Sequence, residues 1–412
     1  MELVSGLTSY KNCSIFDIGC QSFLIFSQLI RTYWIAYNIL MQNRAPKSLY
    51  YPPINTPKIN LPTPALLIDL PALEFNLALM SRFFIQKSAK LRPHFKTHKC
   101  PIIAKKQVQY GAIGITCAKL SEAEVLVDSG ISSILLANQV VDPAKIHLLA
   151  QLARNSQVIV AVDQLDNLIR IARAGEQAGS TIHVVIEVDV GLHRSGVQPG
   201  EPALRLAQEA SHLSGIHFSG VLGYEGFTMF EVDRSLREDH AKHAMKALVD
   251  TADLIRKTGI PVDIVSAGGT GTYDITGDYP GVTEVEAGSY VFMDTKYNRL
   301  GLAFQQSLTL LSMATSIHTP ERCIIDAGMK VLTTDNGLPE IISAHGLKLQ
   351  KLNEEHGIVE VDPETIQPEV GMCVEIVPSH ACITVNLHDR FYVIKNEQLV
   401  DIWEISGRGK SQ

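Results

Sequence analysis

The chain has 412 residues, of which 46% are hydrophobic and 19% charged, and its formal net charge is -7. This length and composition predict a soluble globular protein with a sizeable core and two domains. Acidic and basic residues are interspersed without an extended basic face, so nucleic acid is excluded as an expected partner and a small molecule is favoured. Seven cysteines without a paired framework or a CxxC spacing indicate reduced thiols, and hence a cytoplasmic location.

The first 55 residues differ in composition from the rest of the chain. Segment 23–41 is apolar and aromatic, but Arg31 and several polar residues interrupt it, so it fits neither a membrane-spanning helix nor a signal peptide. We expect no stable membrane insertion. Three interpretations of this segment stay open: an interfacial helix, a helix packed on the domain, and upstream sequence with the true start at Met41. The last is favoured, because the pattern of a folded domain begins near Pro62.

From Leu61 onward, apolar runs of strand length alternate with segments of helical periodicity, as in repeated βα units around a parallel sheet. In one helical segment, 121–130, Ser121 is the expected N-cap and Gly130 the expected C′ residue. Eight units predict a (β/α)8 barrel over residues 61–300, with its chemistry at the carboxyl ends of the strands. The expected strands are 91–95, 114–117, 133–137, 157–162, 182–188, 220–224, 263–267 and 283–287.

Beyond Leu300 the sequence changes to short alternating segments separated by Gly, Pro and Asn. This pattern predicts a mostly antiparallel β domain over residues 301–412. Segment 65–69 is one strand too many for the barrel, and we expect it to join the β domain. The clearest strands of the β domain are 323–326, 372–378 and 391–395.

The sequence LRPHFKTHK places Lys96 among basic residues at the end of the first expected barrel strand. A lysine that attacks an aldehyde must lose a proton near neutral pH, which requires cationic neighbours or burial. A barrel mouth would provide burial. A solvated basic turn after a short strand is the alternative interpretation. The expected cationic neighbours are Arg92, His94, His98 and Lys99.

Two glycine-rich segments follow the last two expected barrel strands. In SAGGTGT, at 266–272, glycines and hydroxyl residues allow backbone N–H groups to converge on an anion. EAGSY, at 286–290, is expected to complete the same phosphate cradle, since phosphate sites between the last two loops recur in barrels. Taken alone, each glycine cluster is equally consistent with a flexible barrel loop.

The segment GLHRSG, at 191–196, follows an acidic strand end. Its arginine, Arg194, is a candidate to face the phenolic oxygen of a cofactor or the carboxylate of a substrate. Most charged loop residues take part in no chemistry, so a salt bridge from Arg194 to Glu187 or Asp189 is the alternative.

The segment PSHAC, at 378–382, holds a candidate metal site. Residues two apart on a strand point to the same face, so His380 and Cys382 can share one ion. An imidazole and a thiolate favour Zn²⁺ over Mg²⁺, with Mn²⁺ or Co²⁺ as possible substitutes. Two protein ligands would leave positions for water and substrate oxygens. A buried cysteine beside a hydrogen-bonded histidine is the alternative.

Together these motifs resemble those of the D-threonine aldolase and D-serine dehydratase family, a metal-assisted branch of the fold type III pyridoxal-phosphate enzymes. The resemblance extends from about Leu61 to Gln412. It implies an alanine racemase-like barrel and a homodimer. The motifs that carry it are PALLID at 64–69, RPHFKTHK at 92–99, GLHR at 191–194, GYEG at 223–226, the loop at 268–271 and HAC at 380–382.

The resemblance also implies residue roles. Lys96 would form the Schiff base with pyridoxal 5′-phosphate, Tyr224 would lie against the cofactor ring, and Arg194 would contact its phenolic oxygen. His380 and Cys382 would hold a divalent metal. The phosphate would be bound by Thr270 and Ser289 together with Gly268, Gly269, Gly271 and Gly288.

By the same resemblance, the protein is expected to be a lyase acting on β-hydroxy-D-amino acids. Retro-aldol cleavage to glycine and an aldehyde is favoured, and elimination to a 2-oxo acid and ammonia, as in D-serine dehydratase, is the alternative. Aldolases of the family often have aspartate at the position of Cys382, whereas cysteine is familiar from zinc-dependent dehydratases. A racemase gains nothing from a metal and a non-catalytic cofactor carrier needs no metal site, so both are disfavoured.

Overall fold

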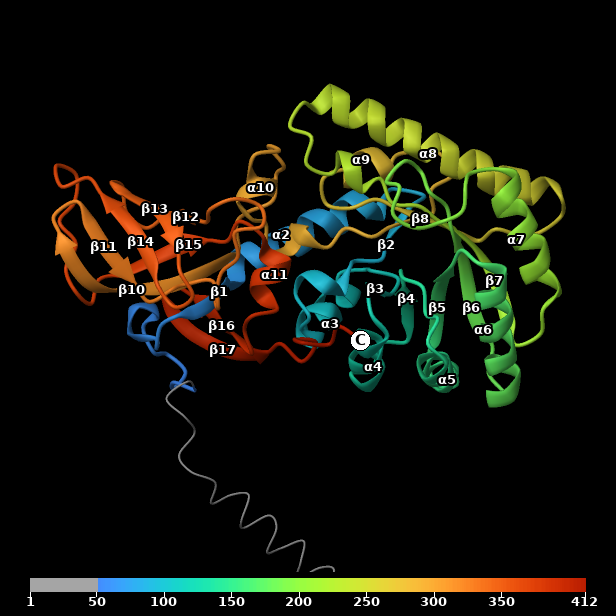
Figure 1. The fold of residues 1–412 in the computed structure, drawn as a ribbon, viewed down its shortest axis with the longest axis horizontal. Coiled ribbons are helices and arrows are strands. Elements are labelled where there is room, and N and C mark those ends of the chain that lie inside the picture. Colours follow the sequence, from blue (N-terminus) through green and yellow to red (C-terminus); the bar gives the residue numbers. More distant parts are fainter. Residues whose placement is uncertain (1–50) are drawn as a thin grey trace, which may run out of the picture. The chain divides into compact units, whose positions relative to one another are not determined.

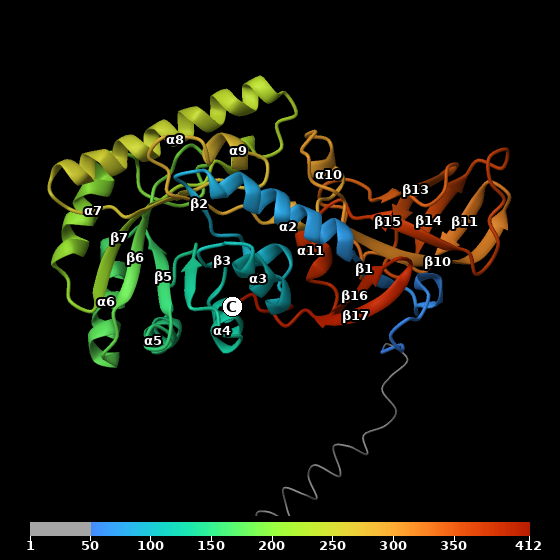
Figure 2. The ribbon, with the colours of Figure 1, turned by 180° about the vertical axis from the view of Figure 1, so that it is seen from behind.

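The computed structural model describes residues 51–412, and two β-sheets organise them (Figures 1 and 2). Residues 53–412 form one compact unit. The expectations for segment 23–41 and for a start at Met41 fall outside the described residues. Within residues 51–412, the structure contains no helix that is both long and apolar enough to cross a membrane.

The first sheet has eight parallel strands in the order β2-β9-β8-β7-β6-β5-β4-β3. Its two ends meet through a parallel bridge between His94 and Thr116, so the sheet closes into the expected barrel. All eight expected strands are present, which confirms the predicted fold class. They are β2 (Lys90–Leu91), β3 (Ile115–Cys117), β4 (Ser133–Leu136), β5 (Gln157–Val162), β6 (Ile182–Glu187), β7 (Ile216–Leu222), β8 (Ile264–Ala267) and β9 (Glu284–Val285).

Helices between the strands bury one apolar face each against the barrel. In α6, buried side chains recur at Leu168, Ile171 and Ala172, and Gly179 ends the helix with a φ of 63°. The interior of the barrel holds its own small apolar cluster, which includes Leu135 and Val185. The helices are α2 (Leu70–Ile85), α3 (Pro101–Gln109), α4 (Leu120–Asp128), α5 (Pro143–Leu152), α6 (Leu165–Ala178), α7 (Glu201–His212), α8 (Arg234–Lys257), α9 (Tyr273–Thr276) and α10 (Thr295–Asn298).

The second sheet has nine strands and is mostly antiparallel, as expected. Strand β1 (Ala65–Asp69) pairs antiparallel with β10 and parallel with β16, and Figure 1 shows it in blue among the orange and red strands of the C-terminal part. The remaining strands are β10 (Leu308–Thr319), β11 (Arg322–Ile325), β12 (Glu340–Ile341), β13 (Leu347–Leu352), β14 (Gly357–Val361), β15 (Cys373–Val377), β16 (Arg390–Lys395) and β17 (Gln398–Glu404).

Several expected boundaries were wrong. The strand expected over 91–95 ends at Leu91, because Pro93 has no N–H to donate to a ladder, and Phe95 already belongs to the 3₁₀-helix η2 (Phe95–Thr97). Strand β7 begins at Ile216, four residues before its expected start, and β9 is shorter than expected. The strands are nevertheless in the predicted order, so the loops at their carboxyl ends lie at the same end of the barrel.

The expected start of helix α4 was also wrong. Its N-cap is Lys119 rather than Ser121. The reason is Glu122, whose carboxylate accepts hydrogen bonds from the backbone N–H groups of Ala118 and Lys119 at 2.8 and 3.2 Å and so fixes the first turn earlier. The expected C′ residue is correct, since Gly130 follows the helix with a φ of 88°.

Candidate active site

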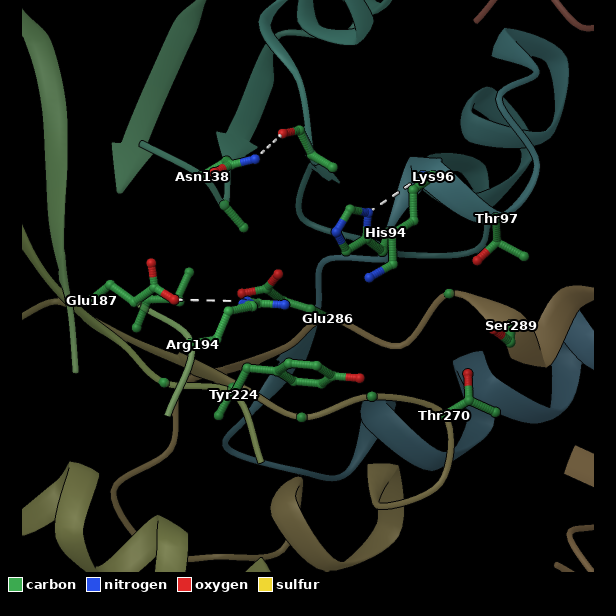
Figure 3. Close-up of a pocket in the computed structure, with 18 of the residues that line it drawn as sticks. His94, Lys96, Thr97, Asn138, Glu187, Arg194, Tyr224, Thr270, Glu286 and Ser289 are labelled. Carbon is green, nitrogen blue, oxygen red and sulfur yellow. Dashed lines mark hydrogen bonds and ion pairs between the residues drawn. The ribbon is translucent and has the colours of Figure 1, made fainter. Parts of the chain in front are cut away.

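A cavity of about 340 Å³ lies at the carboxyl ends of the barrel strands (Figure 3). Its walls come from separate connections: Lys96 follows β2, Arg194 follows β6, Tyr224 follows β7, Thr270 follows β8 and Ser289 follows β9. Gly268, Gly269 and Gly288 line it as well. The structure thus brings together residues from all the loops that the sequence marked, apart from the segment at 378–382.

Lys96 is in the single turn of η2. The backbone N–H of Lys96 donates to Nδ1 of His94 at 3.3 Å, which caps the turn. The Nζ atom lies 5.8 Å from the centroid of the Tyr224 ring, and Figure 3 shows both groups pointing into the cavity. Lys99 is instead buried and forms an ion pair with Glu122, with 2.5 Å between Nζ and Oε1. Of the two lysines of the motif, only Lys96 faces the cavity.

The expectation that basic neighbours surround Lys96 with positive charge was wrong. Burial lowers the pKa of His94 well below its ordinary value and that of His98 to about 3, so both imidazoles are neutral at pH 7. Arg92 forms a buried ion pair with Glu284, at 3.0 Å from Nε to Oε1. Lys99 is likewise paired. The sequence shows the basic residues but not the acids that neutralise them, which come from distant elements.

The glycine-rich loop after β8 is held by a buried carboxylate. Glu225 accepts hydrogen bonds from the hydroxyls of Thr272 and Thr276, at 2.7 and 2.6 Å, and from the N–H of Gly268 at 3.1 Å. The hydroxyl of Thr270 accepts from the N–H of Tyr290 at 2.9 Å and so joins this loop to the loop after β9. Glu225 was not a predicted site residue, although it directly follows Tyr224 in the GYEG motif.

The glycines permit close approaches that no other residue would allow. A Cβ atom at Gly269 would lie 2.8 Å from Sδ of Met229, and one at Gly271 would overlap the carbonyl oxygen of Met229. At Gly288 it would lie 2.8 Å from the hydroxyl of Thr97. The absence of a side chain at these positions therefore lets the two loops pack tightly against Met229 and Thr97.

Arg194 forms the ion pair that the sequence offered as the alternative, and it also lines the cavity. Its Nη2 lies 3.8 Å from Oε1 of Glu187, and its guanidinium carbon lies 5.8 Å from the Tyr224 ring centroid at the cavity wall (Figure 3). Ser195 donates to the same carboxylate oxygen at 2.8 Å. Asp189 is not the partner of Arg194, because its carboxylate bonds to His193.

Glu286 is a cavity residue that the prediction did not single out. Burial raises the pKa of its carboxyl to about 8, although Ser266 donates a hydrogen bond to it at 2.8 Å. A carboxyl with this pKa is mostly protonated at neutral pH and can exchange a proton with a ligand. The sequence contained the residue in EAGSY, but only its burial, together with the nearby charge of Glu284, reveals this property.

The prediction that His380 and Cys382 lie on a strand was wrong. Strand β15 ends at Val377, and helix α11 (Ala381–Val385) begins directly after His380. The carboxylate of Asp294 accepts the N–H of Ala381 at 3.1 Å, which stabilises a helix start there. The extended His380 and the first helical turn still bring the imidazole and thiol into hydrogen-bond contact.

The two side chains influence each other's protonation. Burial lowers the pKa of His380, but the hydrogen bonds and charges of Cys382 and Asp335 outweigh burial and raise it to about 9. Burial raises the pKa of Cys382, but His380, Lys96 and Thr97 outweigh it and lower the pKa overall. A thiol that deprotonates readily beside an imidazole is a suitable donor for a soft divalent metal.

This His-Cys pair borders the cavity residues. The Sγ atom of Cys382 lies 3.4 Å from the hydroxyl of Thr97, the residue after Lys96, and 4.0 Å from that of Ser289. Among residues 51–412, no three His, Cys, Asp or Glu side chains are arranged to hold a metal ion. The pair therefore offers two ligands, and an ion held there would keep open positions.

The cavity meets the requirements of pyridoxal phosphate. Lys96 presents an amine, Tyr224 presents an aromatic face, and Thr270 and Ser289 present hydroxyl groups for an anion at the end of the cavity lined by Gly268, Gly269 and Gly288. A barrel with such a site, followed by a β domain, defines a fold type III pyridoxal-phosphate enzyme.

Comparisons with known proteins identify the family. Residues 68–296 match the model of the alanine racemase N-terminal domain, and residues 307–394 match that of a putative serine dehydratase domain. The chain is 41% identical to an Arthrobacter D-threonine aldolase over 360 residues, which cover 86% of this chain and 95% of that protein. It therefore belongs to the D-threonine aldolase and D-serine dehydratase family and is a pyridoxal-phosphate-dependent lyase.

Further relatives include both reaction types. The crystal structure of a D-threonine aldolase from Filomicrobium marinum, 35% identical, superimposes with a TM-score of 0.86 and covers 88% of this chain and 100% of that one. A Delftia D-threo-3-hydroxyaspartate dehydratase is 31% identical over 84% of this chain and 97% of that protein. Two structures of a dehydratase of this name are 28% identical to this chain, each with a TM-score of 0.78. One is a cysteine-to-alanine mutant in the metal-free form, and the other is a histidine-to-alanine mutant. Each match covers 85% of this chain, with 98% of the cysteine mutant and 96% of the histidine mutant.

The position of Lys96 generates a spectroscopic prediction. Lys96→Ala should abolish the visible absorbance of a lysine-bound cofactor, because no other described lysine lines the cavity. Lys119→Ala, at an exposed position, should keep the absorbance. The spectra of both purified variants, compared with wild type after dialysis, check this. An unchanged spectrum in folded Lys96→Ala protein would refute the assignment.

The buried His98 generates a pH prediction. Its pKa is lowered on folding, so the unfolded chain binds the extra proton and stability falls as the pH drops below about 6.5. His98 alone should cost about 2 kcal/mol of unfolding free energy between pH 7 and pH 5. Urea unfolding of His98→Gln should show a correspondingly smaller loss, whereas replacing the exposed His147 should change nothing. Equal pH slopes for wild type and His98→Gln would contradict it.

Proposed function

We propose that this protein cleaves β-hydroxy-D-amino acids by a retro-aldol reaction, giving glycine and an aldehyde, as a D-threonine aldolase does. The observation that carries the proposal is the contact between Cys382 and Thr97, which brings a metal donor within one residue of Lys96. An amino acid bound at Lys96 could then reach a metal at the His-Cys pair. The 41% identity to a D-threonine aldolase supports this reaction.

The residue roles form part of the proposal. Lys96 binds the cofactor, Tyr224 supports its ring, and Arg194, steadied by Glu187, contacts its phenolic oxygen. Residues 61–300 act as the cofactor domain, and residues 301–412, joined by β1, carry the metal site. The phosphate is bound by Thr270 and Ser289 with Gly268, Gly269 and Gly288, which line the cavity, and the metal by His380 and Cys382. Gly271, whose N–H donates to Sδ of Met229 at 3.2 Å, does not line the cavity and is left out of the proposed site.

The chemistry depends on which proton is removed. When bound, pyridoxal phosphate supplies an electron sink for charge at Cα, and a divalent metal supplies a Lewis acid for substrate oxygens. Removal of the β-hydroxyl proton breaks the Cα–Cβ bond and releases an aldehyde. Removal of the Cα proton by the Lys96 amine leads instead to loss of the β-hydroxyl group. Tyr224, on whose ring Lys96 lies, keeps this amine at one face of the cavity.

Elimination to a 2-oxo acid and ammonia is the second candidate, and Cys382 is the observation that favours it. The substituted histidine and cysteine of the dehydratase structures are two positions apart, as His380 and Cys382 are, and the cysteine mutant is metal-free. By analogy, we propose that the His-Cys pair holds a divalent metal. The nitrogen and sulfur donors favour zinc, with manganese or cobalt as alternatives.

Product analysis tests these proposals. Purified protein should convert D-threonine to glycine and acetaldehyde, and a chelator should abolish turnover until metal is restored. Cys382→Ser should keep the absorbance of the lysine-bound cofactor but lose turnover. Formation of 2-oxobutanoate from D-threonine, or of pyruvate from D-serine, as the main product would favour the dehydratase. Full turnover by metal-free wild type would rule out the metal-assisted reaction.

We also propose a cytoplasmic homodimer. Three large apolar side chains, Phe227, Val232 and Leu236, are 47, 60 and 48% exposed within the segment after Tyr224. Exposed apolar groups this close together in the sequence favour a protein interface in this segment. Light scattering should give twice the chain mass of 45.2 kDa, and Leu236→Glu should shift the protein towards monomer. A monomer at all accessible concentrations would refute the dimer.

A further inference from the structure

The imidazole of His380 has a second polar partner besides Cys382. Its Nδ1 atom lies 2.6 Å from Oδ2 of Asp335, a residue of the segment between β11 and β12. A carboxylate can only accept here, so Nδ1 carries a proton in both the charged and the neutral ring. Nε2 is then the nitrogen that releases its proton when the ring binds a metal ion.

Asp335 is itself fixed in place. Its other carboxylate oxygen accepts a hydrogen bond from the hydroxyl of Thr333 at 2.7 Å. The hydroxyl of Ser379, the residue before His380, donates to the carbonyl oxygen of Thr333 at 2.8 Å. Asn336 accepts from Nζ of Lys296 at 3.1 Å. The carboxylate is therefore held by a segment that is anchored beside the histidine it contacts.

A contribution to stability does not account for this arrangement. The side chains of His380 and Asp335 are 25 and 37% exposed, and ion pairs as exposed as this add little to folding free energy. What the contact does control is the direction of the imidazole ring and the nitrogen that carries the proton. Carboxylates placed behind metal-binding histidines have this effect in general and also raise the basicity of the ligand.

We propose that Asp335 is a positioning residue that holds His380 in the ring orientation and tautomer required to bind a divalent metal with Cys382. The inference rests on the proposed metal role of the His-Cys pair. Asp335 also places one negative charge behind the imidazole, which favours a cation on its other side. Loss of such a partner weakens metal binding by roughly 10- to 100-fold in other proteins, and we expect a loss of that size here.

Zinc affinity of the cofactor-loaded protein tests the proposal without relying on activity. Competition with a chromogenic zinc chelator should show weaker binding in Asp335→Asn by roughly 10- to 100-fold, with partial recovery in Asp335→Glu. Asp362→Asn is the matched control, because Asp362 also accepts hydrogen bonds from a threonine hydroxyl and a backbone N–H on the β domain. It should bind zinc like wild type. His380→Ala should lose the site.

The outcomes separate this inference from the function on which it rests. Wild-type affinity in His380→Ala would refute the metal site itself. Weak binding in His380→Ala with wild-type affinity in Asp335→Asn would overturn the role of Asp335 alone. If Asp335→Asn fails to fold, Thr333→Val, which keeps the carboxylate but frees it to rotate, should still weaken zinc binding, and unchanged affinity there would overturn the inference.

Discussion

The site depends on the close packing of one turn, η2, between the loop after β9 and the helix α11. Gly288 makes this possible, since a side chain there would collide with the hydroxyl of Thr97. Thr97 in turn lies 3.4 Å from Sγ of Cys382. Thr97 thereby links three parts of the site in space. These are Lys96 of the barrel, the loop at Gly288 and the thiol of Cys382 from the β domain. Any change that pushes η2 outward would disturb the cofactor and the metal pair together.

The basic side chains around η2 are buried at a low energetic cost, because each one is either paired with an acid or uncharged. Arg92 and Lys99 form buried ion pairs with acids from β9 and α4, and His94 and His98 are uncharged at neutral pH. Most of the basic motif is therefore buried and paired structural material of the barrel mouth. Lys96 is the lysine of the motif whose amino group faces the cavity. Positive charge near it comes from Arg194, which arrives from a different strand end and is itself balanced by Glu187.

In the proposed function, the reaction type depends on the donors around the metal and on proton transfer rather than on the fold. Aldolases and dehydratases with this domain pair superimpose on the same framework. His380 contacts Asp335 and Cys382 contacts Thr97, so each of the two proposed ligands has a partner of its own. An ion held by these two groups would be open to substrate oxygens. Glu286, a buried carboxyl with a pKa of about 8, adds a proton that can be exchanged near neutral pH.

The sequence by itself determined the repeated βα pattern, the order of the strands and the motifs at their ends, because these depend on local periodicity and on short contiguous segments. It could not determine how the charged and titratable side chains are paired. The partner of Arg92 lies 192 positions away in the chain, and the partner of His380 lies 45 positions away. It also misassigned the HAC segment, because the helix start after His380 depends on Asp294, far along the chain. Side-chain protonation and ligand orientation follow from three-dimensional neighbours, and only the tertiary structure decided them.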